Sequence, residues 1–293
     1  MITRRCTQRQ HLLRPDPDTN ESFEYNLAAS SWRCGIQLLA WCAMSNHYHA
    51  VVHDPDGRLP EFLEDFHKFT AKTLNDRWGR WENFWSTEQT CVVALETFED
   101  VLDKVVYVLA NPVNDHLVDR VADWPGASAL RLFLQDRSRR VARPRFYFRA
   151  NGCMPESVDL QAVPPPGVDR DVWISLVVEA VEVRERAIRE ARLQRGARIL
   201  GRKAVLATSP FDKPASREPR RNLRPTVACR DRSRRVRALE ALRAFRERYG
   251  RALKLFMSGV RNVVFPVGTY RLRLLGAACE LPAGSAPLAC ASG

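Results

Sequence analysis

The sequence predicts an α+β protein: an N-terminal domain built on an antiparallel sheet, followed by a mainly helical, arginine-rich C-terminal region. Two observations support this fold class. In residues 1–130, short apolar runs alternate with longer segments of helical period. The formal charge also divides near residue 130. Residues 1–130 carry 12 Lys or Arg against 19 Asp or Glu, whereas residues 131–293 carry 34 against 15.

Three segments in the first part are apolar or β-branched enough to form strands. They are residues 2–6, 35–44 and 47–53. The second segment is apolar at almost every position, as in a strand buried on both faces. Because only Ser45 and Asn46 separate it from the third segment, we expect these two strands to form a hairpin.

Three further segments of the first part have helical spacing. They are residues 21–33, 59–77 and 100–110. We expect Asn20 to cap the first helix and Gly79 to end the second. The Asn111-Pro112 pair closes the third, because the residue before a proline disfavours the helical conformation. In chain order the expected elements are a strand, a helix, a hairpin and two helices. We expect them to form one domain over residues 1–130.

Beyond residue 130 we expect a basic and proline-rich linker over residues 131–168, and a basic helical region over 169–293. The linker holds the stiff stretch VPPPG, and residues 216–226 are too rich in Pro and Arg to pack. Amphipathic helices are expected over 169–195 and 236–257. An excess of nineteen positive charges is usually offset by an anionic partner, so DNA binding is expected of the C-terminal region.

Several classes of protein are disfavoured by the composition. No run approaches about 18 uninterrupted apolar residues, so we expect no membrane span and no membrane partner. The eight cysteines form no C-x-x-C pair, which disfavours a zinc ribbon and a disulfide framework. The first residues also lack the apolar core of a signal peptide. We therefore expect a cytoplasmic, nucleoid-associated protein.

Two histidines one residue apart form the first candidate site. Successive side chains of a strand alternate between its faces, so His47 and His49 point the same way and Tyr48 points to the other face. Their Cα atoms would lie about 6.5 Å apart, which allows both imidazoles to bind one ion. His53 shares the face but stands about 13 Å beyond His49. The alternative is a pair of packed, hydrogen-bonded histidines without a ligand.

The helix around Tyr107 forms the second candidate site. At 100° per residue its apolar side chains gather on one stripe, and Tyr107 falls almost opposite, on the polar face. Asp103 and Asn111 lie one turn to either side of Tyr107. A hydroxyl nucleophile and an amide oxygen could then face the same metal-bound phosphate. Asp103 is a weaker candidate for the base that deprotonates Tyr107, since exposed acids on helices are usually idle.

The stretches AWCAMSNHYHAVV, YVLANPV and DWPGAS resemble the REP-associated tyrosine transposases, which are single-tyrosine HUH transposases. The residues that fit the two family motifs are Met44, Asn46, His47 and His49 in the strand, and Tyr107, Asn111, Pro112 and Val113 in the helix. The resemblance covers roughly residues 2–130, with the motifs in order and about sixty residues apart. Two departures from the family pattern are Ser45 in place of a proline and a less basic stretch at 114–116.

The resemblance implies a ferredoxin-like HUH catalytic domain over residues 1–130. It implies a metal-dependent single-stranded DNA endonuclease and strand transferase, a transposase that acts on hairpin-forming repeats. Tyr107 would attack the phosphodiester and form a 5′-phosphotyrosine. His47, His49 and Asn111 would hold Mg²⁺ or Mn²⁺. The implied partner is single-stranded or hairpin DNA, and the oligomeric state, a homodimer included, stays open.

The stretch RSRRVARPRFYFRA at 137–150 interleaves arginines with aromatic residues, a composition that suits backbone contacts and base stacking. The DNA contacts expected there are Arg139, Arg140, Arg143, Arg145 and Tyr147. The alternative is a strand with a solvated basic face. Two other functions stay open. One is a catalytically quiet DNA-binding protein derived from a transposase, and the other is a metal phosphodiesterase that acts through water.

Overall fold

The computed structural model describes residues 1–135, 138–149, 151–215 and 225–280. Its chain is α+β, and its contacts divide it into two units, Met1–Arg230 and Asp231–Gly293. None of the described helices is long and apolar enough to cross a lipid bilayer. The cysteines of the described residues are free thiols. Part of the stretch 216–226, which the sequence predicts not to pack, lies outside the described residues.

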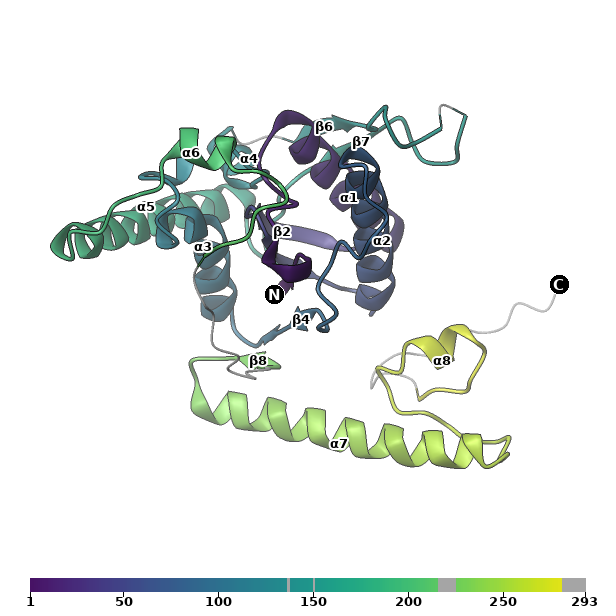
Figure 1. Cartoon of the computed structure of the whole chain (residues 1–293). Helices are drawn as coiled ribbons and strands as arrows, with labels where there is room; N and C mark the ends of the chain where they lie inside the picture. The colour runs from purple at the N-terminus through teal and green to yellow at the C-terminus, as the bar shows by residue number, and fades with distance from the viewer. Residues whose placement is uncertain (136–137, 150, 216–224, 281–293) are drawn as a thin grey trace. The chain divides into compact units, whose positions relative to one another are not determined.

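A four-stranded antiparallel sheet forms the centre of the first unit (Figure 1). Its strands are β1 (Ile2–Arg5), β2 (Gln37–Ala43), β3 (His47–His53) and β4 (Cys91–Val92), in the order β2-β3-β1-β4. The hairpin of β2 and β3 is confirmed. The sequence did not predict β4, because two residues are too few to show a period, yet β4 pairs with β1 at the edge of the sheet.

Helices cover both faces of this sheet. On one face lie α1 (Pro17–Cys34) and α2 (Leu59–Arg77), and the ring of Tyr48 points between them. On the other face α3 (Phe98–Asn114) packs against β2 and β3, and α5 (Arg170–Gln194) packs against α3. The hydrophobic core is continuous through these layers.

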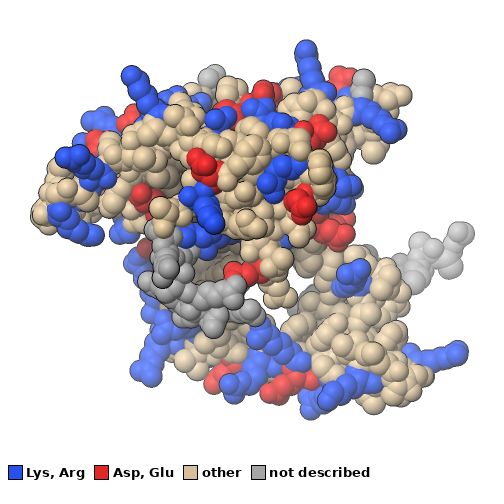
Figure 2. Space-filling view, in the orientation of Figure 1, with Lys and Arg blue, Asp and Glu red and all other residues tan. Residues whose placement is uncertain are grey.

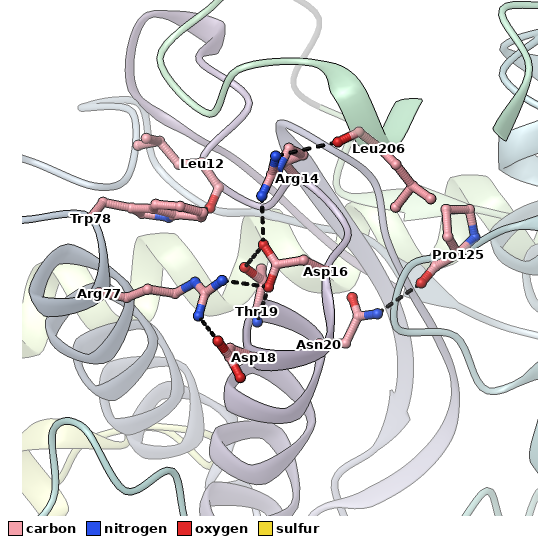
Figure 3. Close-up of polar contacts among 10 residues, drawn as sticks. All are labelled: Leu12, Arg14, Asp16, Asp18, Thr19, Asn20, Arg77, Trp78, Pro125 and Leu206. Carbon is pink, nitrogen blue, oxygen red and sulfur yellow. Dashed lines mark hydrogen bonds and ion pairs between the residues drawn. The ribbon is translucent and has the colours of Figure 1, made fainter. Parts of the chain in front are cut away.

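Helix α1 begins earlier than predicted, because Asp16 rather than Asn20 is its N-cap. The Asp16 carboxylate accepts a hydrogen bond from the Thr19 amide at 2.9 Å, and Pro17 occupies the first helical position (Figure 3). The prediction for Asn20 is therefore wrong. Its side chain donates instead to the Pro125 oxygen at 2.7 Å, which ties α1 to the loop after α3.

Helix α3 continues through Pro112 rather than ending before it. Thr97 caps its start, and the amide of Asp115 still donates to the oxygen of Asn111 at 2.9 Å. Proline lacks an amide donor and its ring crowds the carbonyl four residues before it, and α3 ends two residues after Pro112. Asn111 consequently lies inside the helix, one full turn after Tyr107.

The stretch DWPGAS closes over the end of β2. The Trp124 indole donates to the oxygen of Ala43 at 3.1 Å, and the Ala43 amide donates to Ala127 at 2.8 Å. A Cβ on Gly126 would lie 2.4 Å from the Trp124 indole nitrogen and 2.9 Å from the Ala43 oxygen. Only glycine fits this close approach, so the motif has a structural role beside the start of the β2–β3 turn.

The first unit extends well beyond residue 130. The further elements of this unit are η1 (Thr7–Arg9), β5 (Ala94–Leu95), η2 (Val121–Asp123), α4 (Leu130–Gln135), β6 (Arg139–Ala142), β7 (Ser157–Leu160), α6 (Arg202–Ala207) and β8 (Val227–Ala228). The β6–β7 hairpin, in the stretch expected to be a linker, packs on α1, where the Tyr25 hydroxyl donates to the Pro155 oxygen. Val163 is hydrogen-bonded to Leu38 of β2, so the proline-rich stretch is also attached.

The second unit contains α7 (Arg232–Met257) and α8 (Arg271–Leu274). Asp231 caps α7, which places its start four residues before the predicted one. A small core of Ala252, Val263 and Phe265 holds the end of α7 against the residues that follow it. Most side chains in the first half of α7 are exposed.

Glu24 on α1 makes the stability of the first unit depend on pH. Its side chain is nearly buried and pairs with Arg139 of β6 at 2.6 Å. Burial raises the pKa of Glu24 from 4.5 to about 7, although Arg139 and Arg131 oppose the shift. The folded protein therefore holds this proton at a pH where the unfolded chain has lost it. Stability must fall as the pH rises from about 4.5 to about 7.

We predict that Glu24→Gln removes this dependence. Relative to the variant, the wild-type free energy of unfolding should fall by up to about 3 kcal/mol between pH 4.5 and pH 8, since each pKa unit corresponds to about 1.4 kcal/mol. Urea denaturation at several pH values measures it. Glu21→Gln, an exposed position on the same helix, is the control and should follow the wild type. An identical pH profile for E24Q and the wild type would contradict the prediction.

Candidate active site

His47, His49 and Tyr107 lie together in the structure, where α3 crosses the face of β3. The two imidazole rings are 4.8 Å apart between centroids, and the ring of Tyr107 is 5.5 Å from that of His49. Tyr48 points to the opposite face, as the alternation of a strand requires. His53 stands at the other end of β3 and is hydrogen-bonded to Gln37 at 3.1 Å, away from this group.

The side chain of Asn46 fixes the tautomer of His47. The Asn46 amide nitrogen donates to the backbone oxygen of Arg9 at 3.3 Å, and its Oδ1 therefore faces His47 Nδ1 at 2.7 Å. Because this oxygen can only accept, Nδ1 carries the proton and the lone pair lies on Nε2. A metal-ligating histidine is usually held in this way, with its second ring nitrogen donating to an oxygen.

His49 is held from the neighbouring strand. Thr3 lies opposite it on β1, with its hydroxyl 2.7 Å from His49 Nδ1. Burial, together with the charges of His47 and Arg5, keeps the pKa of His49 well below its ordinary value. His49 is therefore neutral at physiological pH, which is the form of histidine that binds metals.

The spacing of the two rings fits a shared metal ion. An imidazole centre lies about 3.2 Å from a metal bound at about 2.1 Å, so two imidazoles on one ion have centres roughly 4.5–5.2 Å apart. The 4.8 Å between His47 and His49 falls in this range. Within the described part of the chain, no group of three or more His, Cys, Asp or Glu is arranged for a metal. Within those residues, a third protein ligand would therefore be of another type.

Asn111 is of that other type. It is only 2% exposed, on α3 one turn after Tyr107. Among the described residues, the structure shows no hydrogen-bond partner for its side chain. An amide oxygen on this helix, which packs on β3, has the chemistry of a third ligand. The role of Asn111 as an oxygen ligand stays a prediction.

Tyr107 is half-buried, which corrects the expectation of a solvent-facing polar side. Helix α3 is covered on two sides: Phe98 packs on Trp173 of α5 at 5.8 Å, and Tyr107 lies toward the sheet. Burial, together with the negative charge of Asp115, raises the pKa of Tyr107 above its ordinary value. Its phenol is protonated at neutral pH. The ammonium of Lys104 lies 5.8 Å from the centre of the ring.

The carboxylate of Asp103, the weaker candidate for a base, is engaged by two cations. It pairs with Arg230 at 2.6 Å and with Lys104 at 3.1 Å. Partial burial works against ionisation, but the hydrogen bonds from Lys104 and Arg230 outweigh it and lower the pKa of Asp103. Arg230 follows β8, and its amide also donates to Asp100 at 2.9 Å, so Asp103 helps to attach the end of the first unit to α3.

The structure does not bring the predicted DNA-binding stretch to this site. Arg139 pairs with Glu24, and Phe148, next to Tyr147, packs on Tyr25, which places the stretch beside α1, on the opposite side of the sheet from Tyr107. The remaining predicted contacts are Arg140, hydrogen-bonded to Ser157; Arg143, hydrogen-bonded to the Met154 oxygen; Arg145, exposed; and Tyr147, half-buried against Phe148.

Sequence reasoning missed Thr3 and Lys104 as members of the site, and it treated Asn46 only as part of a turn and a motif. Thr3 could not be found from local pattern, because its place opposite His49 depends on the pairing of β1 with β3. Lys104 was detectable, since it lies three residues before Tyr107 and so on a neighbouring position of the helix surface.

No family model matches the chain, and no curated protein matches it. One solved structure, described as a REP-associated tyrosine transposase bound to a REP hairpin, is similar to it with 17% sequence identity. The match covers 52% of this chain and 91% of that one, with a TM-score of 0.37. The function of this chain is therefore argued from its own residues.

We predict opposite tautomers for His47 and His67. Asn46 places the proton of His47 on Nδ1, whereas Arg4 donates to Nδ1 of His67 at 2.9 Å and leaves the proton on Nε2, facing the Tyr48 hydroxyl. Long-range ¹H–¹⁵N NMR of the imidazoles distinguishes the two forms. His67 is the internal control, and finding both rings in one tautomer would contradict the assignment.

Proposed function

We propose that the chain is a metal-dependent single-stranded DNA endonuclease and strand transferase. It would be a single-tyrosine HUH transposase that forms a 5′-phosphotyrosine and acts on hairpin-forming repeats. The observation that carries the proposal is the contact of the Tyr107 ring with His49, beside an imidazole pair spaced for one ion. A phenol nucleophile and a metal-competent pair in one place suit phosphodiester cleavage through tyrosine.

The sheet supports a ferredoxin-like catalytic domain within the first unit. The elements β1, α1, β2, β3, α2 and β4 follow one another in the chain, and the strand order is β2-β3-β1-β4 with every pairing antiparallel. This arrangement places β3 inside the sheet and leaves one of its faces to α3. The histidines and the tyrosine would then belong to two layers of one domain.

His47, His49 and Asn111 would hold the divalent ion, Mg²⁺ or Mn²⁺. When bound, such an ion polarises the scissile phosphate and stabilises the leaving 3′-oxygen. Neutral imidazoles favour Mn²⁺ over Mg²⁺, while the amide oxygen suits either ion. Burial of His49 and Asn111 limits the access of water to this side of the site.

The reaction makes one bond to phosphorus and breaks one. The phenol oxygen of Tyr107 would attack the phosphorus as the bond to the 3′-oxygen breaks. The phenol proton would pass to water, and the leaving 3′-oxygen would take up a proton from water. The products are a 5′-phosphotyrosine and a free 3′-hydroxyl. Because the phosphotyrosine retains the ester bond, a 3′-hydroxyl can reverse the step and join strands without ATP. Lys104 lies over the face of the Tyr107 ring, 5.8 Å from its centre, and adds a positive charge beside it.

Single-stranded or hairpin DNA would be the substrate, and the second unit would add contacts to its phosphates. Helix α7 carries eight arginines and one lysine against two glutamates. Figure 2 shows these cationic side chains projecting along α7 with few acidic ones between them. Such a helix would bind the negatively charged phosphates of DNA, with little dependence on the base sequence.

We predict that Tyr107→Phe abolishes the covalent adduct. The change removes one oxygen from a half-buried ring, so it should alter stability by no more than about 1 kcal/mol. The test incubates the protein with labelled hairpin DNA and Mn²⁺ and maps the modified peptide by mass spectrometry. Tyr147→Phe is the control, since its ring lies outside the site. An adduct that survives Y107F, or that maps to another residue, would overturn the assignment of the nucleophile.

We predict that His49→Ala abolishes nicking and weakens Mn²⁺ binding at least tenfold, because one of two imidazole ligands is lost. His53→Ala lies on the same strand and face but outside the group, so it should leave both properties unchanged. Calorimetric titration of metal-free protein with Mn²⁺ measures the affinity, and a gel assay measures nicking. Wild-type nicking in EDTA would rule out the metal. Equal losses in H49A and H53A would point to general damage to β3.

A further inference from the structure

A groove of about 520 Å³ opens in the first unit between two segments that are far apart in the sequence. One wall is η1 with the residues after it, and the other is the segment after α6. The lining residues used below are Gln8, His11, Phe211, Asp212 and Lys213. The volume lies in the range of pockets that hold small ligands or single nucleotides. None of these residues belongs to the group formed by the histidines and Tyr107.

The two walls are hydrogen-bonded to each other. The amide of His11 donates to the oxygen of Asp212 at 3.0 Å, and the Gln10 side chain donates to the oxygen of Phe211 at 3.3 Å. Further along, Arg14 donates to the oxygen of Leu206 at 3.3 Å, as Figure 3 shows. These hydrogen bonds hold the segment that carries Phe211 against the residues after η1. The groove between them therefore exists before a ligand binds.

The groove adjoins the turn that begins β3. The amide of Cys6 donates to the oxygen of Asn46 at 2.8 Å, and Asn46 reaches back to Arg9. Gln8 and Arg9 have φ values of 49° and 62°, the left-handed conformation that non-glycine residues rarely adopt. Such strain costs of order 1 kcal/mol or more per residue and persists mainly where a site requires it. Asn46 precedes His47, so the groove lies close to the histidine end of β3.

The chemistry of the lining suits a nucleotide. Phe211 is 50% exposed and presents a ring on which a base can stack. His11 Nδ1 is buried without a hydrogen-bond partner. Gln8 has an exposed amide, and Asp212 has a carboxylate that can accept from base amino groups. Lys213 is an exposed cation next to them, suited to a phosphate.

We propose that this groove binds one unpaired nucleotide of the DNA strand. Phe211 stacks on the base, and Lys213 contacts its phosphate. Gln8 and Asp212, which are both exposed, face the hydrogen-bonding edge of the base, so the groove contributes sequence preference to the reaction. This inference rests on the proposed function for its substrate, but the groove and its chemistry are independent of Tyr107.

The experiment locates the nucleotide by photocrosslinking. The full-length protein in EDTA, which prevents metal-dependent cleavage, is mixed with a DNA hairpin that carries short single-stranded thymidine arms. One thymine at a time is replaced by 5-iodouracil, and crosslinked peptides are identified by mass spectrometry. We expect one arm position to crosslink to the peptide that contains Phe211. Crosslinks confined to α7 or to residues 138–149 would overturn the proposal.

A double-mutant cycle then tests the stacking. Phe211→Ala should weaken binding of the same hairpin at least about fivefold, the loss of one base–aromatic stack. An abasic site at the crosslinked position should weaken binding to the wild type but have little further effect on F211A. Trp32→Ala removes a more exposed aromatic, at the C-terminal end of α1, and should keep the full affinity and the full effect of the abasic site. Independent, additive effects of F211A and the abasic site would reject the stacking role.

A second pair of variants tests the proposal even if F211A does not fold. Lys213→Gln should weaken binding and flatten its salt dependence, whereas Lys72→Gln, an exposed lysine of α2, should do neither. Equal behaviour of the two lysine variants would reject the phosphate contact. The adduct assay on Tyr107 separates this inference from the proposed function. Crosslinks to Phe211 without an adduct would keep the groove and reject the transposase, and the converse would reject the groove alone.

Discussion

The antiparallel pairing of β3 between β1 and β2 is the constraint on which the site depends. With hydrogen-bonded neighbours on both edges, β3 has one register, in which His49 lies between Thr3 of β1 and Cys42 of β2. A shift of one residue would turn the imidazoles into the α1–α2 layer and Tyr48 toward α3. Such a shift would bury both histidines among apolar side chains, so the core itself enforces the orientation of the site.

Tyr48 holds this register from the opposite face. Its ring packs edge-on against Phe23 and Phe66, and its hydroxyl lies 2.6 Å from the imidazole of His67. Arg4 completes the network by donating to the other nitrogen of His67. A buried polar network whose members satisfy one another favours a single arrangement, since any other would leave polar atoms without partners. The same strand thus carries a structural network on one face and the candidate active site on the other.

Burial has opposite consequences for the groups of the site. It keeps His49 neutral, which suits metal binding, and it keeps the phenol of Tyr107 protonated, which opposes attack. A bound cation would favour the deprotonated phenol. In the proposed mechanism, the phenol of Tyr107 would stay protonated until DNA and metal are bound, which would limit unproductive cleavage.

Local patterns in the sequence determined β1, β2, β3, their hairpin and the long helices, because strand and helix periods are complete within a few residues. They also placed His47 and His49 on one face, since this follows from strand geometry alone. The end of α3 and the start of α1 were predicted less well. There, Pro112 is tolerated near a helix end, and Asp16 with Pro17 is a better cap than Asn20.

Only the tertiary structure decided which faces are covered and which distant residues join the site. Tyr107 was expected on a polar face, yet the sheet and α5 enclose α3 from two sides. Thr3 becomes a neighbour of His49 through the pairing of two strands. Phe211 lies across the groove from His11 because a segment some two hundred residues further along the chain is hydrogen-bonded there. These contacts depend on how the layers pack. The free energy that favours this packing comes from apolar surface buried between segments that are remote in sequence. No local pattern contains that information.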